Sequence, residues 1–214
     1  MKPILLILFT GIFLLFTTLA AAQRPDYIGG GVGLTNFDSI DLAFDSPPGT
    51  TSDDQDNASK FFIGYDLSPN LVFEASYADL GSYSATQTGN YDIGIDVKAI
   101  ALDLLATRNV HPRLDFFARL GLAYWTTDLT YNDFVNNTSA DSADLGIHLG
   151  MGFDLSLGAT SAQKFLLRFE WEQFQNVGQD TNAALPSSAI ELNGNDLDVL
   201  SISVVYRFEL APGN

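Results

Sequence analysis

The sequence has 214 residues, 46% of them hydrophobic, with no cysteine and a formal net charge of −16 at pH 7. That length suits one domain or two small ones. The scarcity of basic residues excludes a nucleic-acid-binding protein, because phosphate contacts need clustered lysines and arginines, and the lack of cysteine excludes a disulfide framework.

The first 22 residues have the pattern of a secretory signal peptide. Lys2 precedes a long uncharged apolar run, which ends in Ala20, Ala21 and Ala22. Small residues at the end of such a run predict cleavage after Ala22. An uncleaved membrane anchor is the alternative interpretation. We therefore expect a cleaved signal peptide at 1–22 and a mature domain at 23–214.

Apolar and polar side chains alternate in eight segments of the mature domain. Alternation with a period of two is typical of strands, because successive side chains point to opposite faces. In chain order the segments are 27–37, 59–67, 70–80, 95–107, 114–125, 145–155, 164–174 and 200–210. The clearest is 145–155, in which each odd residue is apolar and each even residue is Gly, His or Asp.

The connections between these segments also alternate in length. The short ones are 67–70, 109–112 and 156–163, and the long polar ones are 38–57, 81–93, 128–141 and 176–195. Short periplasmic turns and long outer loops are typical of outer-membrane barrels, and strands of about ten residues can cross a bilayer. The pattern predicts an all-β fold, an eight-stranded antiparallel up-and-down transmembrane β-barrel.

A soluble eight-stranded barrel with a wet exterior is the rival fold. The apolar faces here carry almost no charge, and aromatic residues lie near the strand ends, as in membrane barrels. We therefore expect the apolar faces to contact lipid and the opposite faces to line the lumen. Many glycines lie on those opposite faces, which favours some water-filled volume inside.

The first long connection, 38–57, holds six aspartates and no basic residue. Carboxylates are ligands of Ca²⁺ and Mg²⁺, so Asp53, Asp54 and Asp56 form a candidate cation-binding loop. The alternative is a solvated run of charge. We expect no metal site elsewhere, because His111 and His148 lie on separate segments and supply no set of three or four ligands.

Several segments resemble the transmembrane domain of the outer membrane protein A group. They are "YIGGGVGLTNF" (27–37), "LSPNLVFEASYADLG" (67–81), "LDFFARLGLAYW" (114–125) and "LLRFEWEQF" (166–174). The final "VVYRF" (204–208) is similar to the aromatic-ended signal read by the barrel-insertion machinery. Many members carry a peptidoglycan-binding domain after the barrel. Because this sequence ends at Asn214, we expect no cell-wall tethering role.

The same group has an interior cluster of charges that plugs or gates the lumen. The resemblance assigns that cluster here to Glu74, Arg119, Asp154, Arg168 and Glu170, with Asp103 nearby. Strand parity independently turns the first five inward. Where the group can show a lysine in its fourth strand, this chain has Leu105. The charges either satisfy one another, because an unpaired buried charge is costly, or form a gate; we favour mutual pairing.

These patterns predict a structural or surface-interaction protein of a Gram-negative outer membrane, with a charge-filled lumen and acidic outer loops. The alternative function is a small or gated pore for ions or small solutes. No enzyme is expected, because no nucleophile is arranged with a histidine base. Expected partners are outer-membrane lipid, lipopolysaccharide, the insertion machinery and an extracellular molecule bound by the loops. We expect a monomer with no cofactor.

Overall fold

The computed structural model describes residues 25–37, 50–53, 55–87, 91–133, 137–158, 165–177 and 195–208. Within them lie the strands β1 (Tyr27–Phe37), β2 (Thr50–Asp53), β3 (Gln55–Ser68), β4 (Leu71–Gln87), β5 (Tyr91–His111), β6 (Leu114–Asp133), β7 (Asn137–Ser156), β8 (Phe165–Val177) and β9 (Asn195–Arg207). None of these described residues forms a helix long and apolar enough to cross a membrane. The predicted signal peptide at 1–22 lies outside them.

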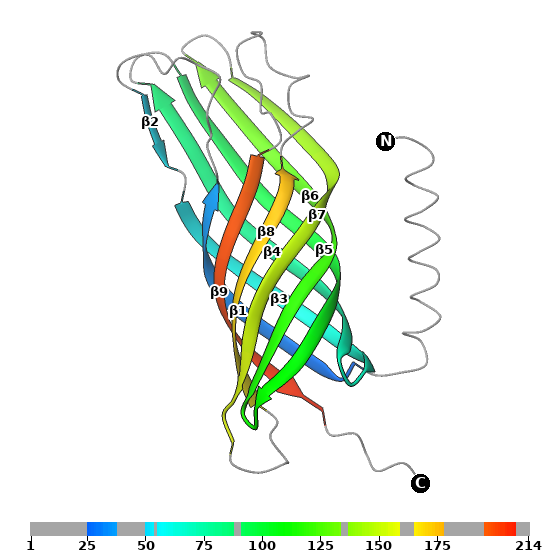
Figure 1. Cartoon of the computed structure of the whole chain (residues 1–214). Helices are drawn as coiled ribbons and strands as arrows, with labels where there is room; N and C mark the ends of the chain where they lie inside the picture. The colour runs from blue at the N-terminus through cyan, green and yellow to red at the C-terminus, as the bar shows by residue number, and fades with distance from the viewer. Residues whose placement is uncertain are drawn as a thin grey trace, which may run out of the picture.

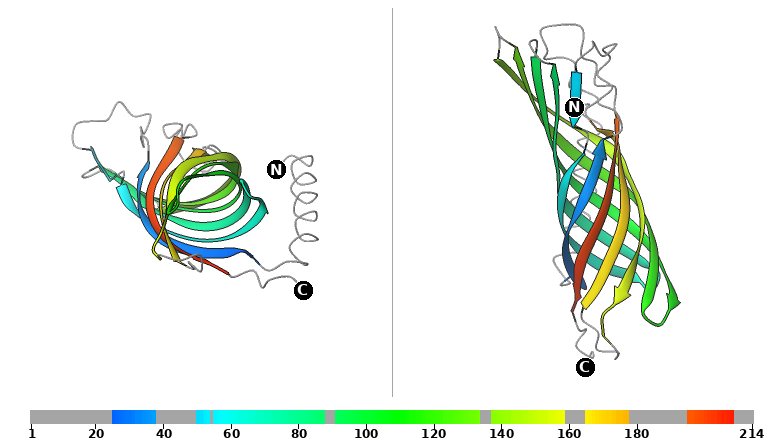
Figure 2. Two further views of the ribbon diagram at one scale, coloured as in Figure 1. Left: turned by 60° about the horizontal axis from the view of Figure 1, so that its bottom comes forward. Right: turned by 90° about the vertical axis from the view of Figure 1, so that its left-hand side faces the viewer.

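The strands close into an antiparallel barrel. With the short β2 set aside, each strand pairs with its neighbours in the sequence, and β1 pairs with β9 from Tyr27↔Arg207 to Phe37↔Leu197 to complete the ring. The view in the left panel of Figure 2 looks partly along this closed ring. The predicted eight-stranded up-and-down barrel is therefore confirmed.

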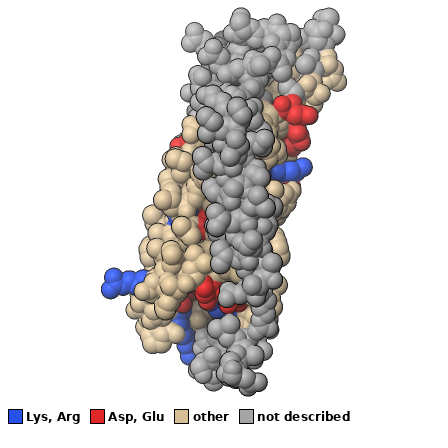
Figure 3. All heavy atoms as spheres, turned by 90° about the vertical axis from the view of Figure 1, so that its right-hand side faces the viewer, with Lys and Arg blue, Asp and Glu red and all other residues tan. Residues whose placement is uncertain are grey.

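Side-chain alternation divides the barrel into an apolar outside and a buried inside. On the outer face Val32 is 62% exposed, Leu120 60% and Leu200 64%, whereas inward-facing neighbours such as Arg119 and Ser201 are buried. Most of the visible described surface in Figure 3 is uncharged, with a few scattered Lys, Arg, Asp and Glu side chains. This is the predicted arrangement, with the apolar face placed to contact lipid.

The prediction of long loops at 81–93 and 128–141 was wrong. The β4–β5 pairing continues to Gln87↔Tyr91 and the β6–β7 pairing continues to Asn132↔Asn137. These four strands therefore extend past the ends of β1, β8 and β9, as Figure 1 shows. The period-two pattern continues in β5 and β6, because Ile93 and Leu129 on the inner face are buried.

Two further strand segments occupy the predicted acidic loop at 38–57. β2 pairs with the outer end of β4, from Thr50↔Gln87 to Asp53↔Ser84, and β3 begins already at Gln55. Polar residues become strands here because the extended β4 offers unpaired backbone groups, which overrides the weak local preference of the sequence.

The strand β4 contains a bulge where the extension begins. The β4–β5 register shifts between Asp79 and Gly81, and Gly81 has a φ of 94°, a conformation that a side chain would strain. The carboxylate of Asp56 accepts hydrogen bonds at 2.7 Å from the backbone N–H groups of Ser82 and Asn57. Beyond the bulge the inward parity changes, so that Tyr83 points inside.

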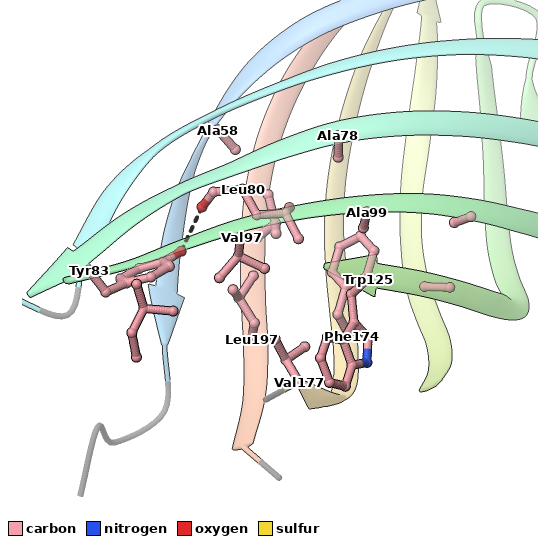
Figure 4. Close-up of a cluster of buried hydrophobic side chains, with 14 of the residues drawn as sticks. Ala58, Ala78, Leu80, Tyr83, Val97, Ala99, Trp125, Phe174, Val177 and Leu197 are labelled. Atoms are coloured by element: carbon pink, nitrogen blue, oxygen red, sulfur yellow. Dashed lines mark hydrogen bonds between the residues drawn. The ribbon is translucent and has the colours of Figure 1, made fainter. Parts of the chain in front are cut away.

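Buried side chains fill the barrel in three layers. The layer nearest the short turns is aromatic and aliphatic, and consists of Tyr27, Phe62, Val72, Leu105, Phe117, Leu166 and Val205. The middle layer is charged. The outer layer is a larger apolar cluster that includes Tyr83, Val97, Trp125, Phe174 and Leu197 (Figure 4). Eight strands enclose an interior that side chains can fill.

The inward glycines do not leave spare volume. A Cβ built on Gly29 would overlap the Phe62 ring, and one on Gly64 would overlap the Tyr27 ring. On Gly152 it would overlap Phe117 in the same way. The expectation of water-filled space around these glycines is corrected, because each makes room for a large side chain from another strand.

Candidate functional site

The middle layer is a set of buried ionisable side chains, called here the lumenal charge cluster. It contains the six sequence-predicted residues Glu74, Asp103, Arg119, Asp154, Arg168 and Glu170, together with Lys60, His148 and Glu172. They come from β3, β4, β5, β6, β7 and β8, so the cluster joins six of the eight strands that close the barrel.

Arg119 on β6 is the centre of the cluster, with its side chain completely buried. Its Nη2 lies 2.8 Å from Glu74 Oε1 and also contacts Glu170 Oε1. Its Nη1 lies 2.9 Å from Glu172 Oε1 and 3.2 Å from Asp103 Oδ2. One guanidinium thus faces four carboxylates from three other strands, because its planar fork presents several donors at fixed angles.

Arg168 on β8 forms a second centre nearer the short turns. It binds Asp154 through two parallel hydrogen bonds of 2.8 and 2.9 Å, and its Nη1 donates to Glu74 Oε2 at 2.6 Å. Its guanidinium lies 4.6 Å from the ring centre of Phe117, within the range of a cation–π contact. The hydroxyl of Tyr27 donates to the same oxygen of Glu74 at 2.6 Å.

Lys60 and His148 belong to the cluster although the sequence analysis did not assign them to it. The ammonium of Lys60 lies 2.6 Å from Glu172 Oε2 and also contacts Glu170. The lysine of the cluster thus comes from β3, whereas the resemblance pointed to the strand that holds Leu105. His148 Nδ1 lies 2.8 Å from Asp103, and the ring stacks on Phe174 at 4.2 Å.

The sequence does carry a local signal for Lys60 and for Glu172, a third cluster residue that the sequence analysis did not assign. Lys60 has the same parity as the inward Phe62 and Gly64, and Glu172 follows Arg168 and Glu170 on one face. Parity alone turns these residues inward but does not say which strands face them across the lumen.

The strand register explains how the charged side chains find space and partners. Asp154 lies directly opposite Arg168, whereas Arg119 and Glu172 both lie opposite Gly150, which leaves room for their long side chains. Glu74 lies directly opposite Asp103, a pair of like charges that would be destabilising alone. Arg119 binds both carboxylates and so offsets that repulsion.

The cluster contains five carboxylates and three permanent cations, and His148 lies between Asp103 and Glu172 as a further base. Such a network stabilises the closed barrel only while its members remain paired, since each buried charge has lost its hydration. These contacts therefore join side chains from six strands across the lumen. In the described part of the chain, no three His, Asp or Glu residues are grouped to hold a metal ion.

The candidate cation-binding loop is described only in part. Asp53 lies exposed in β2, and the carboxylate of Asp56 in β3 accepts two backbone N–H groups, as given above. Asp54 lies outside the described residues. Binding of a divalent cation there stays a prediction.

Comparison with known proteins gives a consistent family match. The model of the family described as "Outer membrane protein beta-barrel domain" matches residues 8–208. Outer membrane protein A of Escherichia fergusonii is 27% identical over 209 residues, which cover 92% of this chain and 54% of that protein. The protein of the same name from Shigella dysenteriae gives the same identity and coverage. The chain spans about half the length of these curated relatives.

Two solved structures share the fold at low sequence identity. Neisserial surface protein A is 10% identical with a TM-score of 0.52, and the match covers 85% of this chain and 96% of that one. The attachment invasion locus protein Ail of Yersinia pestis, in complex with the heparin analogue sucrose octasulfate, is 9% identical with a TM-score of 0.50. That match covers 85% of this chain and 97% of the other.

Proposed function

Because this chain belongs to the outer membrane protein β-barrel family, we propose that it is a structural and surface-interaction protein of the outer membrane, with a lumen closed by its charge cluster. The extended ends of β4, β5, β6 and β7 and the outer connections would present its interaction surface to the outside. The short turns would face the periplasm, as is general for such barrels.

The three filled layers of the lumen are the observation that carries this proposal. Arg119 contacts carboxylates from β4, β5 and β8, and Lys60 reaches Glu172 from β3. Contacts that join so many strands favour a static cross-link. A gated pore for ions or small solutes is the alternative, and it requires the same ion pairs to separate.

Conductance separates the two functions. The mature chain, refolded into planar bilayers, is compared with the double variant Glu74→Gln and Arg119→Gln. The control is the double variant Lys98→Gln and Asp141→Asn, which removes one charge of each sign from exposed positions. We expect no current steps across bilayers that contain the wild-type or the control barrel. Discrete current steps in folded wild-type protein, enlarged in the first variant, would instead establish the pore.

We further propose that residues 1–22 are removed on export, so that the mature protein begins at Gln23. Mass spectrometry of the protein extracted from outer membranes tests this directly. A mass that still includes residues 1–22 would contradict the proposal. The aromatic end of β9, where the Tyr206 and Phe208 rings meet edge to face at 5.3 Å, is the proposed signal for the insertion machinery.

The remaining functional proposals concern partners and chemistry. We propose lipid and lipopolysaccharide around a monomeric barrel, an extracellular partner at the outer end, and no catalytic role. His148 is held inside the barrel by Asp103 and Glu172, and His111 accepts the backbone N–H of Arg113 in an exposed turn. Neither geometry presents a base to a nucleophile.

A further inference from the structure

A cavity of about 320 Å³ opens at the short-turn end of the barrel, on the far side of the aromatic layer from the outer loops. Its inner wall is formed by the buried side chains of Val72 and Phe117 and by the carboxylate of Asp154. The backbone N–H of Thr107 donates to the carbonyl of Asn70 at 3.0 Å and joins the β3–β4 turn to β5 at the rim. The volume lies at the lower end of the range of small-molecule pockets.

The lining of this cavity is polar, and its carboxylates differ in whether an arginine pairs with them. Asp66 lies 2.8 Å from Arg207, and both oxygens of Asp154 accept hydrogen bonds from Arg168. Within the part of the chain that the structure describes, the Asp115 carboxylate accepts a side-chain hydrogen bond only from the neutral amide of Asn109, at 2.8 Å. Of the three lining carboxylates, Asp115 is thus the one that forms no ion pair with a described lysine, arginine or histidine.

The surroundings of Asp115 indicate the class of ligand. A half-buried carboxylate is stabilised by a cation, and a charge-assisted hydrogen bond is about twice as strong as a neutral one. No other described carboxylate joins it in a group able to hold a metal ion, which favours an organic cation over an inorganic one. The Phe117 ring and Val72 offer an apolar surface for a short carbon chain, and the side-chain amide oxygens of Asn70 and Asn109 offer further acceptors for an ammonium group.

We propose that this cavity is a binding site for a small alkylammonium solute, whose ammonium group pairs with Asp115 while its carbon chain lies against Phe117. The site goes beyond the proposed function, because a closed barrel and a gated pore would both retain it. A linear diamine carries such an ammonium group at the end of a flexible carbon chain.

The test uses the refolded full-length mature chain in detergent micelles and 1,5-diaminopentane as the probe. Isothermal titration is run beside 1,5-pentanediol, a neutral molecule of the same length. Asp115→Asn removes the charge but keeps an oxygen that accepts from Asn109. Asp141→Asn, an exposed change on β7 at the other end of the barrel, is the matched control.

We expect saturable binding of the diamine by wild-type protein and by the Asp141 variant, no binding of the diol, and at least about tenfold weaker diamine binding by the Asp115 variant. Equal affinity in the Asp115 variant would overturn the proposal, as would equal binding of the diol or the absence of saturable binding at millimolar diamine. If the Asp115 variant fails to refold, wild-type protein that binds the diol as well as the diamine, or that shows no saturable diamine binding, still overturns the proposal.

Discussion

Replacement of Arg119 by alanine should destabilise the barrel more than any other single change in the lumenal charge cluster. The side chain is completely buried and lies within 3.2 Å of Glu74, Asp103 and Glu172, with Glu170 also in contact. Its loss would leave four carboxylates with only Arg168, Lys60 and His148 to compensate them. Glu74 and Asp103, directly opposite each other, would then repel.

The size of the effect follows from the burial of these groups. Removal of one partner from a buried ion pair costs about 3–5 kcal/mol, because the remaining charge stays desolvated and unpaired. A domain of this length loses about 2–4 °C in Tm for each kcal/mol of unfolding free energy. We therefore expect a decrease of roughly 6–20 °C in the thermal transition.

Thermal unfolding in detergent micelles, followed by circular dichroism, measures this decrease. Arg113→Ala is the matched control, since Arg113 lies exposed in the β5–β6 turn, where substitutions usually change stability by no more than about 0.5 kcal/mol. A transition temperature of the Arg119 variant equal to that of the control would refute the view that the cluster cross-links the strands.

Three more predictions concern the lumen and the outer end of the barrel. Gly29→Ala should lower the unfolding free energy in urea by about 1–3 kcal/mol, because its Cβ meets a ring, whereas Gly30→Ala next to it meets no atom closer than 3.4 Å and should not. The backbone amides of Ile93 and Leu129 should exchange slowly with deuterium, and rapid exchange would contradict the strand extensions. Millimolar calcium should protect residues 38–57 from protease; unchanged cleavage would leave the acidic run as a solvated segment.

The predicted loops at 81–93 and 128–141 are the part of the fold that the sequence pattern misidentified. Residues 81–93 and 128–141 are rich in polar side chains on their outer face, and such composition indicates loops in a membrane barrel. On the inner face, Ile93 and Leu129 continue the parity of β5 and β6, whereas β4 continues with the changed parity that follows its bulge. Strand pairing beyond the bilayer satisfies the backbone N–H and C=O groups whether the outward side chains are polar or apolar. Polar outward side chains therefore indicate where the membrane ends, and they do not indicate where the strands end.

The inward direction of the cluster residues was predictable from the sequence alone, but their partners were not. Alternation is a local property of a strand, so Glu74, Arg119 and Arg168 could be turned inward without knowledge of the fold. Contact between Lys60 and Glu172 joins residues that are far apart in the chain. It depends on the register of every pairing around the ring, because a shift of one residue would move a side chain to the other face.

The positions of the eight barrel strands, and the apolar and polar face of each, could be read from the sequence alone, because both follow from a period of two within short segments. Three further features depend on the closed barrel. The lumen fills in three layers, aromatic rings occupy the space beside Gly29 and Gly64, and one guanidinium contacts four carboxylates. Those outcomes depend on which strands face one another across the lumen, and that is a property of the closed ring, whose strand tilt and stagger no single strand encodes.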